Sequence, residues 1–304
     1  MTHSPLLSVS DLSVRISTRS GNVQAVNGVS FTLAAGQTLA LVGESGSGKS
    51  MTAMSLIGLT PVGTKVATSG RAIFLERDLL SLPEKELRHI RGRRIAAIFQ
   101  DPSAALNPLM SVAEQIVEAL PSDIRRTGRA ERHVANLLRE VGLDGIADIA
   151  RRHPHELSGG QQQRVAIATA LAGNPSILIA DEPTTALDMT VQAQILDLLR
   201  RLQEDRGMAI LLITHDLGIV ANYADDVLVL QKGNAVEYGP ARDVLTAPKE
   251  DYTRMLLDAR PRILASDETQ AVSIGEETLL SVENLVVSYP GAASSRAPPR
   301  PLAA

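Results

Sequence analysis

Residues 38–50 read TLALVGESGSGKS, a short apolar run followed by a loop of glycine and serine. The loop from Gly43 to Ser50 matches the pattern G-x-x-x-x-G-K-[ST], and an apolar stretch of helical character follows it. Glycines let backbone N–H groups curl around phosphate oxygens, and the N-terminus of the next helix adds the positive end of its dipole. The stretch therefore predicts a strand, a phosphate-binding loop and a helix, against the alternative of a flexible turn.

The residue types in this loop predict which of its side chains bind the nucleotide and the metal ion. Lys49 is expected to reach the β- and γ-phosphates of a nucleotide, and the Ser50 hydroxyl is expected to ligate Mg²⁺. The candidate nucleotide-binding residues here are Gly43, Glu44, Ser45, Gly46, Ser47, Gly48, Lys49, Ser50 and Met51.

A second apolar run, ILIADE at residues 177–182, ends in two carboxylates. Sites in parallel sheets form at the carboxyl ends of strands, so Asp181 and Glu182 are expected beside the phosphate loop if the two strands are neighbours. Asp181 would hold Mg²⁺ through water, and Glu182 would polarise the attacking water. The alternative is a solvated acidic turn.

The stretch LSGGQ at residues 157–161 begins a helix whose apolar residues run to a stop at Asn174 and Pro175. Ser158 is a natural N-cap, and the amide groups of the glycines at the helix start form a second anion site. A capped helix start with no ligand is the alternative.

Strands and helices alternate along the chain. The first third is rich in predicted strands, the middle is helical with breaks at Pro121 and Gly128, and the last part alternates strand and helix. Strands are predicted at residues 7–16, 23–33, 38–42, 176–180, 208–213 and 227–230, and helices at 112–141 and 190–206. This alternation predicts an α/β fold with a mostly parallel sheet covered by helices.

Composition excludes several classes of protein. The 304 residues are 44% hydrophobic and 21% charged, which is typical of a folded globular protein. The absence of cysteine excludes disulfides, thiolate metal sites and cysteine nucleophiles. The net charge of −4 gives no overall positive field that would recruit nucleic acid, and the arginine clusters at residues 88–94, 125–132 and 151–152 are interpreted as solvated helix faces.

No targeting or membrane-spanning segment is predicted. The opening MTHSPLLSVS lacks the basic start and the long apolar stretch of a secretion signal. No apolar run approaches the roughly 18 residues that span a bilayer. We therefore expect the chain in the cytosol, or docked on a membrane by other subunits.

The motifs occur in the order and spacing of the ATPase subunits of ABC transporters, which the chain resembles over about residues 6–260. They are the phosphate loop (43–50), Gln100 in FQDP, the LSGGQ signature (157–161), the acidic strand end (177–182), Asp188 in ALD and His215 in THD. The resemblance implies a RecA-like P-loop NTPase core, an antiparallel β subdomain on its N-terminal side and a helical signature subdomain at about residues 101–160. It implies one ATPase domain over residues 1–260.

The resemblance also implies roles for single residues, with ATP and Mg²⁺ as ligands. Gln100 resembles the glutamine that ligates Mg²⁺ and senses the γ-phosphate, and Glu182 resembles the catalytic base. His215 resembles the histidine that contacts the γ-phosphate and positions the water and the base. Asp188 resembles the residue that communicates across a dimer. In this family ATP lies between one subunit's phosphate loop and the other's signature, so the partner's nucleotide would bind Ser158, Gly159, Gly160 and Gln161. The implied ligands of Mg²⁺ are Ser50, Gln100 and Asp181.

Longer stretches narrow the resemblance to the importers of peptides and nickel, among them IFQDPSAALNPLMSV at residues 98–112 and EYGPARDVLTAPKEDYTRMLLDARPR at 237–262. The expected function is ATP hydrolysis that powers uptake of dipeptides, oligopeptides or a related solute. The expected partners are a second ABC ATPase, two transmembrane permease subunits, which would contact residues 101–108, and an extracytoplasmic solute-binding protein, with no nucleic acid. The chain would lie peripherally on the cytoplasmic face of the cell membrane.

The chain also departs from this branch. Ile16 stands where the family usually presents an aromatic ring to adenine, and the cysteine-bearing C-terminal extension common in single-ATPase members is absent. Instead LLSVENLVVSY at residues 279–289 repeats LLSVSDLSVRI at 6–16, with Tyr289 at the place of Ile16. We expect a linker at 261–278, then the first strand of a second ATPase copy and an unstructured tail to residue 304. The chain is interpreted as the first half of a tandem protein, against the alternative of a coincidence between two strands.

Two other functions stay open. A soluble tandem ABC protein acting on ribosomes or DNA also needs no membrane span, but it predicts a long charged linker or a coiled coil, which residues 261–278 do not resemble. A nucleotide-binding remnant with little turnover is the other alternative, since the second copy is missing. ATP affinity measured together with turnover separates this remnant from an enzyme.

Overall fold

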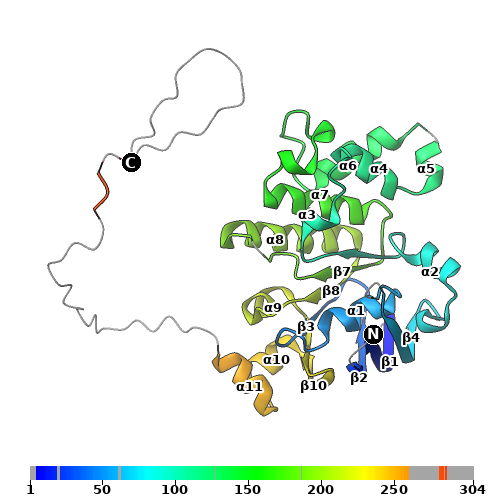
Figure 1. Cartoon of the computed structure of the whole chain (residues 1–304), viewed down its shortest axis with the longest axis vertical. Coiled ribbons are helices and arrows are strands. Elements are labelled where there is room, and N and C mark those ends of the chain that lie inside the picture. The colour runs from blue at the N-terminus through cyan, green and yellow to red at the C-terminus, as the bar shows by residue number, and fades with distance from the viewer. Residues whose placement is uncertain are drawn as a thin grey trace. The chain divides into compact units, whose positions relative to one another are not determined.

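The computed structural model describes residues 5–18, 21–60, 63–126, 128–185, 187–259, 281–283 and 285. Contacts divide the chain into two units, residues 1–260 and 261–304. The first unit contains two β-sheets and a group of helices (Figure 1). No helix among the described residues combines the length and the apolar character that crossing a bilayer demands.

A six-stranded sheet forms the centre of the first unit. Its strands are β3 (Thr38–Val42), β6 (Ile95–Ile98), β7 (Ile177–Asp181), β8 (Ala209–Ile213), β9 (Asp226–Gln231) and β10 (Asn234–Pro240). They lie in the order β10-β9-β3-β8-β7-β6, and all neighbours are parallel except β10, which is antiparallel to β9 at one edge. Every residue of β3, β7 and β8 is buried, as expected for parallel strands covered on both faces.

The N-terminal part of the chain forms a second, antiparallel sheet. Its strands are β1 (Leu7–Thr18), β2 (Gly21–Leu33), β4 (Lys65–Phe74) and β5 (Arg77–Asp78), in the order β2-β1-β4-β5. Leu12 and Val26 of this sheet belong to one buried cluster with Leu39 of β3 and Ala53 of helix α1 (Lys49–Leu56). The two sheets therefore share a core with the helix that follows the phosphate loop.

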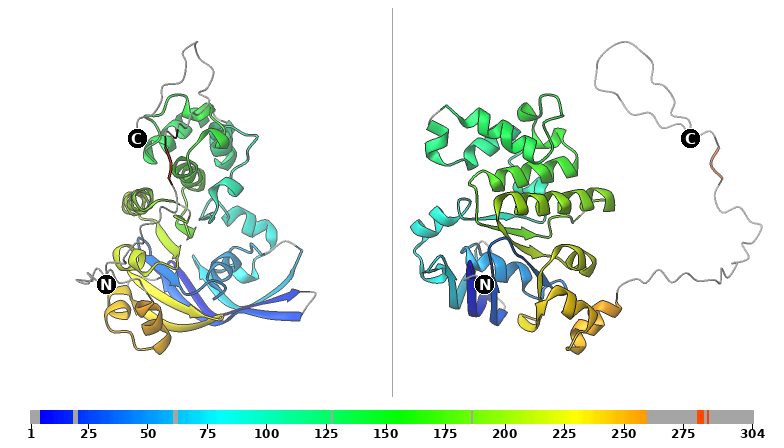
Figure 2. Two further views of the ribbon diagram at one scale, coloured as in Figure 1. Left: turned by 60° about the vertical axis from the view of Figure 1, so that its left-hand side comes forward. Right: turned by 180° about the vertical axis from the view of Figure 1, so that it is seen from behind.

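Helices cover the central sheet and form a subdomain at one end of the unit. They are α2 (Glu84–Ile90), α3 (Pro102–Ala105), α4 (Val112–Ala119), α5 (Ser122–Arg126), α6 (Ala130–Glu140), α7 (Gly159–Leu171), α8 (Met189–Arg206), α9 (Leu217–Tyr223), α10 (Ala241–Thr246) and α11 (Asp251–Asp258). Short 3₁₀ turns lie at Leu79–Ser81, Ile149–Arg151 and Pro154–Glu156. Helices α3 to α6 gather with α7 at the upper end in Figures 1 and 2. Val112, Leu137 and Val165 from these helices join Leu178 of β7 in one cluster, so this subdomain is packed on the sheet.

Most predicted elements are present, within a few residues at their ends. The predicted helical stretch at 112–141 divides into α4, α5 and α6, with breaks at Pro121 and around Gly128 as expected. Strands β4, β5, β6 and β10 were not predicted, and β5 has only two residues, Arg77 and Asp78. Strand β6 has only the four residues IAAI, and β4 and β10 expose most of their polar residues, so none of them carries a strong apolar pattern.

Of the predicted strand at residues 279–289, the structure describes only four residues, so this strand stays a prediction. Ser281–Glu283 and Leu285 have no regular secondary structure. Tyr289 and the predicted linker at 261–278 lie outside the described residues.

Candidate functional site

The loop between β3 and α1 wraps around the side chain of Lys49. Lys49 is buried, and its Nζ donates hydrogen bonds of 2.8 Å to the carbonyl oxygens of Gly43 and Glu44. The glycines are needed because neighbouring backbone lies close. A Cβ atom on Gly43 would meet the carbonyl oxygen of Leu230 at 2.1 Å, and one on Gly48 would meet that of Ala25 at 2.5 Å.

Polar groups of this loop are suited to an anion. The Ser47 hydroxyl is buried without a hydrogen-bond partner, and the N–H groups in the first turn of α1 have no partner within the helix. The pKa of Lys49 is lowered, because burial lowers it more than the charges of Glu182 and Asp181 raise it. A phosphate group would supply acceptors for these donors and a counter-charge for the lysine.

Ser50 and Asp181 form the second part of the site. The Ser50 hydroxyl donates a hydrogen bond of 2.9 Å to Oδ1 of Asp181. The premise that β3 and β7 are neighbours is wrong, because β8 lies between them. The side chains still meet, since both follow the carboxyl ends of parallel strands. Burial raises the pKa of Asp181, with a further increase from Glu182, against the hydrogen bond from Ser50 and the charge of Lys49.

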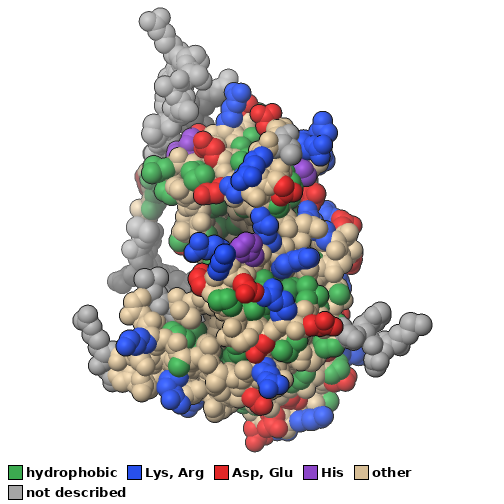
Figure 3. Space-filling model, turned by 90° about the vertical axis from the view of Figure 1, so that its right-hand side faces the viewer, with side chains coloured by type: hydrophobic (Ala, Val, Ile, Leu, Met, Phe, Trp, Pro, Cys, Tyr) green, Lys and Arg blue, Asp and Glu red, His purple; other side chains and the backbone are tan. Residues whose placement is uncertain are grey.

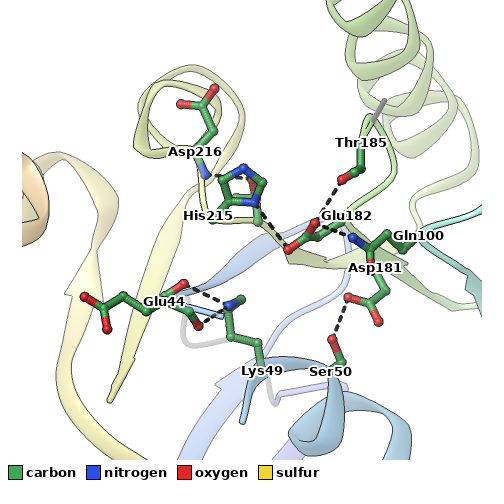
Figure 4. A network of polar contacts seen from close by, with 11 residues as sticks. Glu44, Lys49, Ser50, Gln100, Asp181, Glu182, Thr185, His215 and Asp216 are labelled. Atoms are coloured by element: carbon green, nitrogen blue, oxygen red, sulfur yellow. Dashed lines mark hydrogen bonds and ion pairs between the residues drawn. The ribbon is translucent and has the colours of Figure 1, made fainter. Parts of the chain in front are cut away.

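The carboxylate of Glu182 is held by three side chains (Figure 4). Oε2 accepts hydrogen bonds from Nε2 of Gln100 at 3.0 Å and from the Thr185 hydroxyl at 2.9 Å, and Oε1 lies 3.3 Å from Nδ1 of His215. The backbone of Glu182 has φ +46°, and its N–H donates to the carbonyl oxygen of Ile213 on β8. A non-glycine residue in this left-handed conformation is strained, a feature that often marks functional sites.

The signature LSGGQ is the start of α7. The Ser158 hydroxyl accepts a hydrogen bond from the N–H of Gln161, whose side chain accepts one from the N–H of Ser158. This capping box confirms the predicted helix start. A Cβ on Gly160 would meet Cγ1 of Val191 at 2.7 Å, so the glycine allows α7 to pack on the start of α8.

A protein-family model described as ABC transporter matches residues 26–185, which is more than half of the chain. The chain belongs to the ABC transporter family. The dipeptide transport ATP-binding protein DppD of Bacillus subtilis is 47% identical over 259 residues, which are 85% of this chain and 77% of DppD. The peptidoglycan transport ATP-binding protein YejF of Agrobacterium fabrum is 51% identical over 85% of this chain and 47% of YejF.

A solved structure supports the same assignment of the fold. The ATP-binding cassette MJ0796, a dimer in a post-hydrolysis state bound to ADP and phosphate, has a TM-score of 0.66 and 28% identity. The match covers 78% of this chain and 99% of MJ0796. Like other members of this ABC family, the chain is an ATPase with a P-loop NTPase fold.

The structure brings together most of the side chains that the family resemblance predicted to be catalytic. Gln100, Glu182 and His215 form one network, and Ser50 and Asp181 form a pair. The predicted residues of the signature instead bond to one another within their capping box. Asp188 caps α8 by accepting a hydrogen bond of 2.9 Å from the N–H of Val191. Other predicted site residues, Glu44, Ser45, Gly46 and Met51, lie in the loop and the first turn of α1.

Sequence reasoning missed two residues that contact the site. Thr185 was given no role, although its position three residues after Glu182 permits the observed hydrogen bond. Tyr252 of α11 reaches the backbone N–H of Glu44. No local signal could have identified Tyr252, because it lies more than 200 residues further along the chain.

Proposed function

We propose that this ATPase powers the import of dipeptides, oligopeptides or a related solute, with Glu182 as its catalytic base. The observation that supports the base is the network around Glu182, in which Gln100, Thr185 and His215 fix both carboxylate oxygens. The support for the solute class is the similarity to DppD. The name of YejF widens this class to peptidoglycan-derived compounds.

Hydrolysis requires a group that orients water and accepts its proton. The carboxylate of Glu182 is only 18% exposed, whereas the ring of His215 is 65% exposed. A cleft of about 190 Å³ opens beside both side chains. Water held there by Oε1 of Glu182 would give up its proton to the carboxylate, and His215 and Gln100 would keep the carboxylate in place.

Magnesium fits the oxygen-rich pair next to this network. Among the described residues no cluster of His, Asp or Glu could hold a metal by itself, which matches the usual Mg²⁺ site of one or two protein oxygens completed by phosphates and water. The Ser50 hydroxyl, the Asp181 carboxylate and the side chain of Gln100 would hold the ion. When bound, Mg²⁺ supplies positive charge to the β- and γ-phosphate oxygens.

A second ATPase is the proposed partner for the signature. The dipole and amide groups at the N-terminus of α7 suit a phosphate, yet Ser158 and Gln161 bond to each other rather than to the chain's own phosphate loop. The nucleotide of a second copy, or of a fused one, would complete this half-site. The ATP-binding cassette MJ0796 has been solved as a dimer bound to ADP and phosphate.

A permease helix is the proposed occupant of an apolar groove next to Gln100. The groove has a volume of about 290 Å³, and its lining includes Leu59, Arg91, Phe99, Leu106 and Ala119. Phe99 is 44% exposed and directly precedes Gln100. Movement of a helix in this groove would therefore shift Gln100, which contacts the base. A peripheral position on the cytoplasmic face of the membrane follows from this docking.

The charge on the face seen in Figure 3 gives no support to the nucleic-acid alternative. Figure 3 views the side that carries α2 and α5, and its Lys and Arg side chains are interspersed with Asp and Glu. A binding surface for nucleic acid is expected to concentrate positive charge along a groove or stripe. The mixed charge favours solvated helix faces, as the sequence predicted for the arginine clusters.

The experiment is to express the tagged chain in its source cells, isolate it with its bound partners, and measure uptake of labelled di- and tripeptides. We expect permease subunits to copurify with the chain, and uptake to be lost in Glu182→Gln with the complex still assembled. Copurification of ribosomes instead would overturn the importer assignment. Loss of assembly in the variant would show that Glu182 acts on structure.

A further inference from the structure

Tyr252 connects the last helix of the first unit to the phosphate loop. Tyr252 is 8% exposed and lies in a cluster with Val42 of β3 and Val229 of β9. Its hydroxyl accepts a hydrogen bond of 3.4 Å from the backbone N–H of Glu44, the second residue of the loop. A buried tyrosine usually needs a partner for its hydroxyl, and here that partner is the nucleotide site.

This contact holds the same peptide unit that Lys49 holds from the other side. The N–H of Glu44 and the carbonyl of Gly43 belong to one planar trans peptide, so they point in opposite directions. Lys49 donates to that carbonyl at 2.8 Å, while Tyr252 accepts from the N–H. The peptide between Gly43 and Glu44 is therefore held between two side chains.

The position of Tyr252 is itself fixed. The carboxylate of Glu237 on β10 accepts hydrogen bonds from the N–H groups of Lys249 at 2.9 Å and Glu250 at 3.3 Å, where α11 begins. Nearby, the N–H of Gly233 donates to the carbonyl of Ser47 at 2.9 Å. The stretch from β9 to α11, which lies outside the matched family region of residues 26–185, thus supports the loop at more than one point.

We propose that Tyr252 is a positioning residue of the phosphate-binding loop. When a nucleotide draws Lys49 to its phosphates, the carbonyl of Gly43 loses its donor, and the bond to Tyr252 remains to keep this peptide in place. The loop amides then stay arranged around the β-phosphate. This inference rests on the proposed assignment of residues 43–50 to phosphate binding.

The test is Tyr252→Phe in the full chain, which keeps the ring and removes the hydroxyl. We expect the Kd for both MgATP and MgADP to rise about fivefold, because the peptide between Gly43 and Glu44 then has no side-chain partner once Lys49 turns to the phosphates. The kcat at saturating ATP should fall less than the affinity, since Tyr252 does not contact the network of Glu182, and the Tm without nucleotide should fall by no more than the about 2–4 °C expected for one hydrogen bond. The matched control is Tyr238→Phe, which removes a hydroxyl bonded to Thr32 on the exposed side of β10.

Three outcomes would overturn the proposal. They are an unchanged Kd in Tyr252→Phe, an equal rise in Tyr238→Phe, or a fall in Tm that accounts for the change, which would show a role in packing alone. Lys49→Ala tests the assignment of residues 43–50 to phosphate binding separately from the role of Tyr252. If that variant still bound nucleotide at parental affinity, the assignment of the loop would fail, whatever Tyr252 does.

Discussion

The Ser50 hydroxyl donates a hydrogen bond of 2.9 Å to Oδ1 of Asp181, although the strands that precede these residues are separated by β8. The loop after β3 and the end of β7 thus meet across the intervening strand. An acidic oxygen and a hydroxyl oxygen lie together at the start of the helix that follows the phosphate loop. This pair is the proposed protein contribution to the Mg²⁺ site.

Ser50→Ala tests the metal assignment. Loss of the hydroxyl should raise the Mg²⁺ concentration needed for half-maximal ATPase activity about tenfold, because one oxygen ligand is removed. The measurement is a Mg²⁺ titration of ATPase activity at saturating ATP. Thr246→Ala, which removes a hydroxyl bonded to the Arg242 carbonyl in α10, should leave the titration unchanged. A parental titration in Ser50→Ala would remove this residue from the site.

Asp181→Asn tests how the buried carboxylate of Asp181 affects the free energy of unfolding. The pKa of Asp181 is raised in the folded protein by burial, so its charge opposes folding once the pH exceeds the ordinary value of 3.8. The nucleotide-free variant should therefore have the larger free energy of unfolding at pH 7, and the difference should shrink as the pH falls toward 4. Urea unfolding at several pH values measures this. A variant less stable than the parent at pH 7 would contradict the prediction.

Gly43→Ala tests the close approach between the backbone of Gly43 and the carbonyl group of Leu230. The added Cβ would meet the Leu230 carbonyl at 2.1 Å, so we expect a loss of about 2–3 kcal/mol in the free energy of unfolding. Gly36 also has a positive φ, but a Cβ there meets no atom within 4 Å. Gly36→Ala should lose only about 1 kcal/mol, from backbone strain. Equal losses in urea unfolding would show that the contact with Leu230 has no effect.

Thr185→Val tests the support of the base. The variant keeps the shape of the side chain and removes the hydroxyl that donates to Oε2 of Glu182. A less well oriented carboxylate should lower kcat about tenfold with KM for ATP unchanged. Steady-state kinetics over a range of ATP concentrations separates the two constants. A rise in KM at parental kcat would instead assign Thr185 to binding.

The sequence predicted the central strands because local pattern alone defines them. All five residues of β3, β7 and β8 are buried, so an apolar run marks each strand. The phosphate loop, the cap at Ser158 and the acidic strand end were predicted for the same reason. Their chemistry depends on residue types at fixed spacing.

Features that depend on distant contacts could not be predicted in this way. The insertion of β8 between β3 and β7 is a property of sheet order, and the bond from Tyr252 to the loop joins residues 208 positions apart. The left-handed backbone of Glu182 is likewise imposed by its surroundings. The first strand of a second copy, predicted from a repeat of residue types, stays a prediction because the structure describes only four residues of that stretch.

The most direct test of the central claim is the ATPase rate of Glu182→Gln, beside the control Glu204→Gln, whose side chain is 70% exposed on α8. We expect Glu182→Gln to lower kcat at least about 100-fold, to bind MgATP at parental affinity and to accumulate as an ATP-bound dimer in size-exclusion chromatography. The control should hydrolyse ATP at the parental rate. Turnover of ATP by Glu182→Gln at the parental rate would show that Glu182 is not the catalytic base.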